Sequence, residues 1–213
     1  MGDTFSRIEK QGLENVHVVR MNAEHIGFPD ASFDLALCGF VGWDYCFDFY
    51  LGEFIAPDTR LAEIRRALRD GGRVGFSLWE CQQDIEWLAQ TFLRHFPSLA
   101  PEPDEHGIRR EVVYSKENAE GYHTLLSSAG FGDIRIVTET AGFVCAGKEQ
   151  WWEQMRHVGW DEPLETVKSL GPDRLQAFKE AVFRDLDPFQ QAEGIHFTKT
   201  VSFVFATKQG NGP

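Results

Sequence analysis

Residues 16–38 read VHVVRMNAEHIGFPDASFDLALC, and residues 57–74 read PDTRLAEIRRALRDGGRV; these two stretches decide the fold. In the first, two β-rich runs at 16–19 and 33–37 flank a polar segment with Pro29, Asp30 and Ser32. These residue types favour a tight turn, because proline fixes φ and short polar side chains bond the nearby backbone. The first stretch therefore predicts strand, turn and strand.

The second stretch predicts a helix and then another strand. Asp58 or Thr59 can cap a helix, and its apolar face carries Leu61, Ile64 and Leu68 at helical spacing. The glycine pair at 71–72 predicts the end of that helix, since glycine takes the left-handed conformation at little cost. Alternating apolar residues at 74–78 predict the next strand. Strands that alternate with helices in this way predict a mostly parallel sheet covered by helices.

Composition limits the class of protein. The chain has 213 residues, of which 42% are apolar and 13% aromatic, which is enough to bury a sizeable core. We find no apolar run of membrane-spanning length and no signal-peptide pattern, and we expect a cytoplasmic protein. A net charge of −12 repels nucleic acid and anionic lipid. The four cysteines show neither C-x-x-C pairing nor histidine at ligand spacing, so we predict no metal site and no disulfide framework.

The motifs quoted above, in this order, resemble the class I S-adenosylmethionine-dependent methyltransferases of the small-molecule type (methyltransferase type 11, UbiE-like). The resemblance rests on Asn22-Ala23-Glu24, Phe28-Pro29-Asp30 and Ser32-Phe33-Asp34, followed by Glu63-Ile64, Arg66 and residues 68–74. Later segments agree: residues 115–131 resemble the last helix of the family, 133–138 its sixth strand and 194–208 its closing strand. The resemblance implies an α/β, Rossmann-like doubly wound sheet that is mostly parallel, has helices on both faces and ends in an antiparallel strand.

The beginning of the chain departs from this family. Such enzymes open with a strand, a glycine-rich turn, a helix and a second strand, whose terminal acidic residue holds the ribose. A unit of this kind takes roughly 30 residues, and only 15 precede Val16. Residues 1–15 read instead as the end of a helix closed by Gly12. We therefore expect an N-terminally truncated single domain, 1–209, that binds the cofactor weakly, with a polar tail at 210–213.

Truncation has a consequence for the sheet. The family's strand order is 3-2-1-4-5-7-6, so the absent strands would lie between the runs at 16–19 and 33–37. An unpaired strand edge invites pairing. The two runs could pair directly, or a second copy or another polypeptide could complete the sheet; we favour a homodimer or swapped assembly over direct pairing.

Two further segments lie outside the common frame. Residues 96–110 are rich in proline and charge and predict a loop, either a cover over an active site or a solvated connection. Residues 144–191 carry apolar stripes at helical spacing and predict a helical insertion between the last two strands. Such stripes are more often core packing than a substrate wall.

The resemblance assigns the cofactor-binding residues. Ligands of an open α/β sheet lie beyond the carboxyl ends of its strands. There the family places a residue at Asn22 that accepts a hydrogen bond from the adenine, with Ala23 and Glu24 beside it; the alternative is that Asn22 only caps a turn. Cys38, Gly39 and Phe40 correspond to backbone contacts with the methionine part of the cofactor. Cys38 is not expected to be a nucleophile, since no basic residue lies near it in the sequence.

An aromatic cluster follows, with six rings between residues 40 and 50. Aromatic rings attract a sulfonium by about 0.5–2 kcal/mol and form dry pocket walls, although a packing role is an equal alternative. Trp43, Tyr45 and Trp79 are the candidate substrate-binding residues. No catalytic residue is assigned, because a general base is optional for an acceptor that is already nucleophilic.

The sequence thus predicts transfer of a methyl group from S-adenosylmethionine to a small-molecule acceptor, with an activity that truncation could impair. The alternative is a non-catalytic, methyltransferase-like protein that binds a ligand or another protein.

Overall fold

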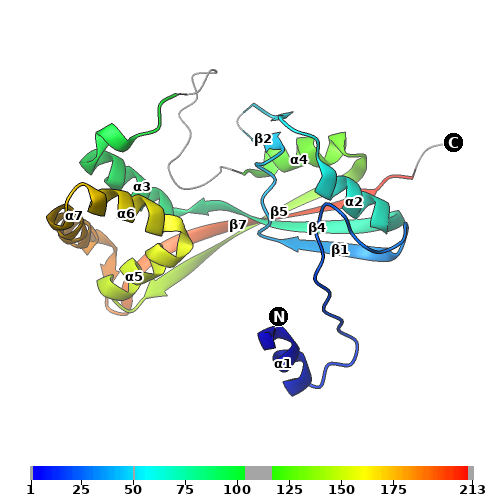
Figure 1. The fold of residues 1–213 in the computed structure, drawn as a ribbon, viewed down its shortest axis with the longest axis horizontal. Coiled ribbons are helices and arrows are strands. Elements are labelled where there is room, and N and C mark those ends of the chain that lie inside the picture. The colour runs from blue at the N-terminus through cyan, green and yellow to red at the C-terminus, as the bar shows by residue number, and fades with distance from the viewer. Residues whose placement is uncertain (1, 50, 104–116, 211–213) are drawn as a thin grey trace.

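The computed structural model describes residues 2–49, 51–103 and 117–210. Its centre is a sheet in the order β1-β4-β7-β5, with β6 added beside β7 (Figure 1). The strands of this sheet are β1 (Phe33–Gly39), β4 (Leu68–Gln82), β5 (Phe131–Cys145), β6 (Gln190–Gln191) and β7 (Gly194–Lys208). A separate small hairpin pairs β2 (Phe47–Asp48) with β3 (Glu53–Phe54).

Helices make up most of the remaining described chain. They are α1 (Gly2–Lys10), α2 (Thr59–Ala67), α3 (Gln83–His95), α4 (Ala119–Ser128), α5 (Lys148–Met155), α6 (Asp161–Ser169) and α7 (Pro172–Asp185). Three short segments complete the list: the 3₁₀ turns η1 (Pro97–Leu99) and η3 (Asp187–Phe189), and the π-helical segment η2 (Arg156–Trp160). No helix of the described residues is long and apolar enough to cross a membrane.

The sheet order confirms the expected frame. The order β1-β4-β7-β5 corresponds to the 4-5-7-6 part of the family's strand order. The antiparallel last strand is also confirmed, because β7 runs antiparallel to both β4 and β5. A mostly parallel sheet is not confirmed: among the described strands, β1 and β4 form the one parallel pair.

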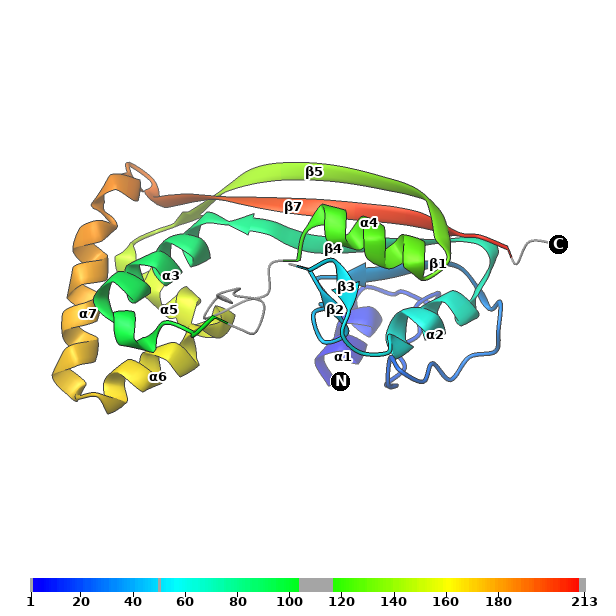
Figure 2. The ribbon, with the colours of Figure 1, turned by 90° about the horizontal axis from the view of Figure 1, so that it is seen from above.

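Two hydrophobic clusters lie on opposite faces of the sheet. Ile195 and Phe197 of β7 pack in one cluster and Val204 and Ala206 in the other. Successive side chains of a strand point to opposite faces, and the β5–β7 register has no shift between these positions. Helices α2 and α4 therefore cover one face at one end of the sheet, and α3 with α5–α7 cover the other face at the other end. The long strands twist along their length, so the two opposite faces are turned towards the same side of the molecule at the two ends of the sheet. Both helical layers therefore lie on the same side of the sheet in Figure 2.

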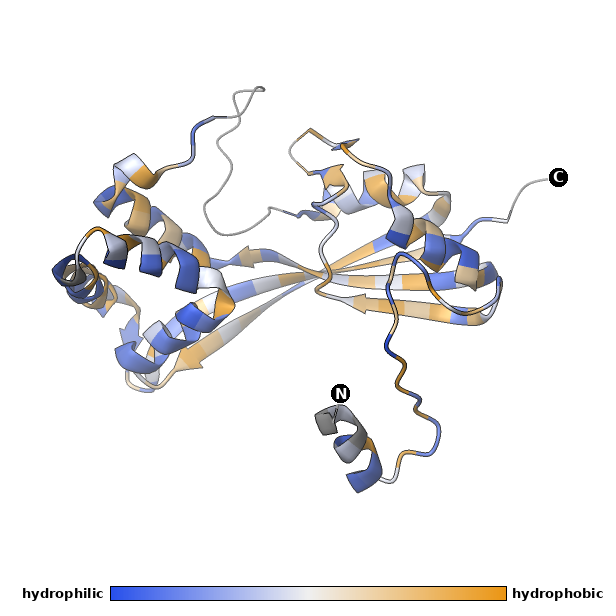
Figure 3. Ribbon diagram, viewed as in Figure 1, coloured by the Kyte–Doolittle hydropathy of each residue, from blue (hydrophilic) through white to orange (hydrophobic). Residues whose placement is uncertain are grey.

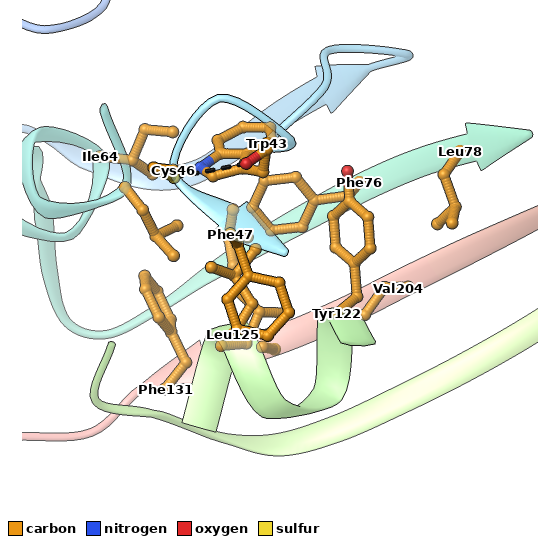
Figure 4. Close-up of a cluster of buried hydrophobic side chains, with 14 of the residues drawn as sticks. Trp43, Cys46, Phe47, Ile64, Phe76, Leu78, Tyr122, Leu125, Phe131 and Val204 are labelled. Carbon is orange, nitrogen blue, oxygen red and sulfur yellow. Dashed lines mark hydrogen bonds between the residues drawn. The ribbon is translucent and has the colours of Figure 1, made fainter. Parts of the chain in front are cut away.

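The cluster under α2 and α4 holds much of the aromatic segment. Trp43, Phe47 and Tyr122 pack around Phe76 of β4, with Trp43 edge-on to Phe76 (Figure 4). The other cluster confirms that the apolar stripes of the insertion are mainly core, since Trp151, Trp152, Met155, Phe178, Val182 and Leu186 are buried.

The two stretches that carry the family resemblance are joined by a side-chain clamp. The Arg66 guanidinium of α2 donates to the Phe28 carbonyl oxygen at 2.9 Å, to the Ile26 carbonyl oxygen at 2.8 Å and to Asp30 Oδ1 at 2.7 Å. Glu63 pairs with the same guanidinium and accepts from the Ile26 amide at 2.8 Å. The spacing of Glu63 and Arg66 thus fixes the turn before β1 against α2, which is a structural role.

Local signals at the two helix ends were partly right. Asp58 caps α2, because its carboxylate accepts from the Leu61 amide at 2.9 Å. The helix stops at Ala67, before the glycine pair, and Gly71 takes its left-handed conformation (φ 73°) inside β4. The expected N-terminal helix is α1, and Gly12 follows it with φ 63°. Figure 1 shows α1 apart from the sheet.

The prediction of a strand at 16–19 is wrong. Residues 16–20 form no strand, and the pairing nearby is an isolated bridge between Asn22 and His25. Direct pairing of 16–19 with 33–37 is therefore absent, and β1 lies at the end of the sheet. Its side chains are largely apolar (Figure 3), and Leu37 is 71% exposed. The predicted loop at 96–110 runs into residues 104–116, which lie outside the described chain.

Candidate functional site

The backbone turns sharply where β1 ends. Gly39 lies opposite Ser77 of β4, and the Phe40 amide donates to the Ser77 carbonyl oxygen at 2.9 Å. Phe40 has φ 53°, a left-handed conformation that is uncommon for any residue with a side chain. Backbone strain of this kind is concentrated at functional sites. The strained turn presents the Phe40 ring, which is 51% exposed, beyond the carboxyl end of the strand.

The ring of Phe40 stacks on the ring of Trp79, an aromatic residue of β4. Their ring centroids lie 4.5 Å apart with an interplanar angle of 21°. The residue after Trp79 is Glu80, whose Oε2 atom is enclosed and has no hydrogen-bond partner among the described residues. An enclosed carboxylate oxygen without a donor is costly unless a ligand supplies one. Phe40 and Trp79 thus form a candidate aromatic site at the end of β1, and Glu80, the next residue along β4, carries an unused acceptor.

Cys38 precedes this turn and faces the core cluster under α2 and α4. Burial raises the pKa of its thiol to about 11, so the thiol stays protonated at neutral pH. This agrees with the expectation that Cys38 is not a nucleophile.

The loop after Phe40 is held by a half-buried carboxylate that the sequence analysis did not single out. Glu117 accepts hydrogen bonds from the Trp43 amide and, at 2.9 Å, from the Tyr122 hydroxyl. Burial raises the pKa of Glu117, and burial together with the Glu117 charge raises the pKa of Tyr122. A usable signal was the position of Glu117 beside Asn118, which caps α4 through its side chain.

Two of the candidate substrate-binding residues have packing contacts in this structure. Trp43 is 1% exposed and lies in the core cluster. The Tyr45 hydroxyl donates to Asp58 Oδ1 at 3.0 Å, and the Arg60 guanidinium lies 3.5 Å from the Tyr45 ring centroid. Burial raises the pKa of Tyr45, which makes it a poor general base at neutral pH.

The three residues assigned to the adenine end form an exposed turn. Asn22 Oδ1 accepts from the Glu24 amide at 3.1 Å, and the Asn22 amide group donates to Glu24 Oε2 at 3.4 Å. Asn22, Ala23 and Glu24 are all exposed. The turn-capping alternative for Asn22 is therefore realised in this structure, and the adenine contact stays a prediction.

Comparisons with known proteins concern the domain and its fold. Residues 4–76 match the family model described as a methyltransferase domain. Among solved structures, the chain is similar to the YcgJ protein from Bacillus subtilis, with 17% sequence identity and a TM-score of 0.51 over 97% of this chain and 77% of that one. A search of curated proteins finds no match.

Two other solved structures are similar at lower TM-scores. Phosphoethanolamine N-methyltransferase 2 from Haemonchus contortus has 18% identity and a TM-score of 0.42, over 96% of this chain and 40% of that one. The [4+2]-cyclase SpnF has 18% identity and a TM-score of 0.43, over 98% of this chain and 62% of that one. At this level of similarity neither carries an argument about shape or activity.

The structure brings Gly39, Phe40 and Trp79 together at the carboxyl end of β1, which is where an open α/β sheet binds its ligands. The family match covers the same strand and the α2 clamp. Residues 4–76 thus match a methyltransferase domain, and the described chain shares the fold of the YcgJ protein.

Proposed function

We propose that this protein takes part in transfer of a methyl group from S-adenosylmethionine to a small-molecule acceptor. The observation that carries the proposal is the strained turn at Phe40, stacked on Trp79, at the carboxyl end of β1, where an open α/β sheet binds its ligands. The match of residues 4–76 to a methyltransferase domain supports it. The negative net charge of −12 favours a small molecule over nucleic acid as acceptor.

The residues present fit such a cofactor. Its sulfonium is a cation, and the stacked rings of Phe40 and Trp79 offer an aromatic surface that attracts a cation. The backbone of Cys38 to Phe40 would hold the methionine end, and Asn22 with Ala23 the adenine. When bound, the cofactor supplies an electrophilic methyl group, so the protein needs to place the acceptor and exclude water.

Glu80 is our candidate for the proton acceptor. Its Oε2 atom lacks a donor among the described residues and can accept the proton that an acceptor hydroxyl or amine loses. Exchange to Gln keeps the shape and removes the base. We expect E80Q to lower the methylation rate of a hydroxyl acceptor while the affinity for the cofactor changes little.

The test of cofactor binding is a calorimetric titration with S-adenosylmethionine. F40A should weaken binding by roughly 2- to 30-fold, which corresponds to about 0.5–2 kcal/mol of cation–π attraction. F205A is the matched control, because Phe205 is also an exposed aromatic residue of the sheet. Equal affinities in wild type, F40A and F205A would remove Phe40 from the site, and no heat from any of them would contradict cofactor binding itself.

One observation favours the alternative, a methyltransferase-like protein that binds another polypeptide. β1 is an edge strand of the sheet, and its exposed side chains include Leu35 and Leu37. An exposed apolar edge strand is a template for pairing. A second copy or a partner chain would complete the sheet there. Size-exclusion chromatography with light scattering tests this, and a stable monomer at micromolar concentration would exclude association between copies.

A further inference from the structure

A second pocket lies under the helical insertion, between the far ends of β5 and β7 and the segment α5–η2. Its volume is about 300 Å³. Its polar lining consists of Asp84, Cys145, Gln154, His157 and Lys199. The sequence analysis assigned this region to packing, and no residue of the pocket belongs to the site described above.

The helix after α5 is broken where it borders the pocket. Val158 (φ −107°, ψ 29°) and Gly159 (φ 105°) depart from helical geometry inside η2. Only glycine adopts φ near 105° without strain. The break leaves His157 and Val158 in the pocket lining. Single π-type turns within helices are frequently found at functional sites.

A buried ion pair crosses the pocket floor. Lys199 Nζ lies 3.0 Å from Asp84 Oδ2, and their side chains are 12% and 6% exposed. Lys199 also donates to Gln82 Oε1 at 3.4 Å. The other Asp84 oxygen, Oδ1, accepts from the Ile85 amide at 3.0 Å. Asp84 is therefore satisfied, while Lys199, which has three hydrogens to donate, keeps one without a partner among the described residues.

The remaining polar groups are also mainly donors. The Cys145 thiol donates to Gln154 Oε1 at 2.9 Å, which leaves the Gln154 amide nitrogen without a partner in the described chain. His157 likewise has no hydrogen bond to a described residue. Burial raises the pKa of Cys145, so its thiol adds no negative charge. A ligand that fits this lining presents acceptor oxygens.

The rest of the pocket lining is apolar. Phe143, Met155, Val158 and Phe197 line it. The Lys199 ammonium lies 5.4 Å from the Phe143 ring centroid and 5.6 Å from that of Trp79. Trp79 is the residue on which Phe40 stacks. Lys199 therefore contacts both the pocket and the stacked pair.

We propose that this pocket binds a small molecule with an aromatic or otherwise apolar body and a carboxylate or carbonyl oxygen that accepts from Lys199. Its volume lies at the lower end for ligand pockets, about 300–1,000 Å³, which suits one or two fused rings. The inference rests on the proposed function in one respect: the occupant is the methyl acceptor.

The test uses two probes of equal size and opposite charge, 2-naphthoate and 2-naphthylmethylammonium, titrated at 0.15 M salt without cofactor. We expect the carboxylate to bind at least tenfold more tightly than the ammonium. V158W should weaken naphthoate binding at least tenfold by filling the pocket mouth. L170W is the matched control, because Leu170 is an exposed residue at the end of α6, outside this pocket. The L170W variant should bind naphthoate as tightly as wild type.

A double variant tests whether the charge of Lys199 causes the preference for the carboxylate probe. K199M combined with D84N removes both members of the ion pair, so that no buried charge is left alone, and it should abolish the preference for the carboxylate. Circular dichroism confirms folding of each variant. Equal binding of the two probes to wild type, or unchanged naphthoate binding in V158W, would overturn the proposal. Because these titrations contain no S-adenosylmethionine, failure to bind the cofactor would contradict the proposed function and leave the pocket result standing.

Discussion

The ion pair between Lys199 and Asp84 allows a quantitative prediction about stability. K199M removes the ammonium and leaves the Asp84 carboxylate buried without its cation. Breaking one side of a buried pair costs about 3–5 kcal/mol. Asp84 keeps the hydrogen bond from the Ile85 amide, which places the expected loss at the lower end, about 3 kcal/mol. D84N should cost a similar amount, because it strands the Lys199 ammonium between the rings of Trp79 and Phe143.

The assay is equilibrium unfolding in urea, followed by circular dichroism. A slope of about 2–3 kcal/mol per M converts the expected loss into a midpoint shift of about 1–1.5 M. A domain of this length should lose about 6–12 °C in Tm for the same change. K168M is the control, since Lys168 pairs with Glu165 on the surface, and an exposed pair contributes at most about 1 kcal/mol.

The double variant D84N/K199M decides whether the two residues act as a pair. It leaves no isolated charge, so its loss should be well below the sum of the single losses, with a coupling of about 2 kcal/mol or more. Losses that add within about 0.5 kcal/mol would show that the residues are independent and would refute the reasoning.

Three further predictions concern other parts of the molecule. Hydrogen bonds from Arg66 and from the Ile26 amide lower the pKa of Glu63 to about 2 from an ordinary 4.5. The contribution of Glu63 to stability is therefore complete above pH 4.5 and is lost as the pH falls towards 2. E63Q should reduce the fall of the urea midpoint with pH between these values, and an unchanged pH dependence would contradict this. G159A should destabilise the protein by about 1–3 kcal/mol because alanine is strained at φ 105°, whereas G147A, at an extended backbone with open space around it, should change little in the same urea assay. Iodoacetamide should label Cys38 of the folded protein slowly at pH 7 and much faster above pH 10, measured by peptide mass spectrometry, and rapid labelling at pH 7 would show that burial does not hold its pKa near 11.

Local sequence signals predicted the parts of the fold that depend on local chemistry. The Asp58 cap and the left-handed glycine at 71 follow from the conformational preferences of those residues. The strand at 33–37 was predicted from its β-rich run, and the closing strand from the resemblance to the family.

The failures have a physical cause in pairing. A strand needs a neighbour, and the β-branched run at 16–19 has none in the described chain, so it stays irregular and exposed. β5 runs past the predicted end at 138, because Thr138 and Thr140 bond Ser202 and Thr200 across the sheet, and polar pairs of this kind hide the apolar alternation.

The candidate site was predicted in part for the same reason. Gly39 and Phe40 follow a strand that the sequence shows, and Trp79 follows another. Glu117 bonds Trp43 across 74 positions of the chain, and Asp84 pairs with Lys199 across 115. Local sequence can suggest a residue such as Glu117 beside a helix cap, but it does not predict these contacts. Contacts of that range are set by the tertiary fold alone.

The unbroken ladder between β5 and β7 has a mechanical consequence. It is paired without a shift from Cys145 opposite Ile195 to Arg135 opposite Phe205, and it spans both helical layers. Rotating one helical layer against the other about a hinge would break a row of backbone hydrogen bonds. The sheet can therefore bend or twist gradually, but it cannot hinge sharply between the two layers. A distortion at the insertion is therefore transmitted to the opposite end of the sheet as strain in the strands.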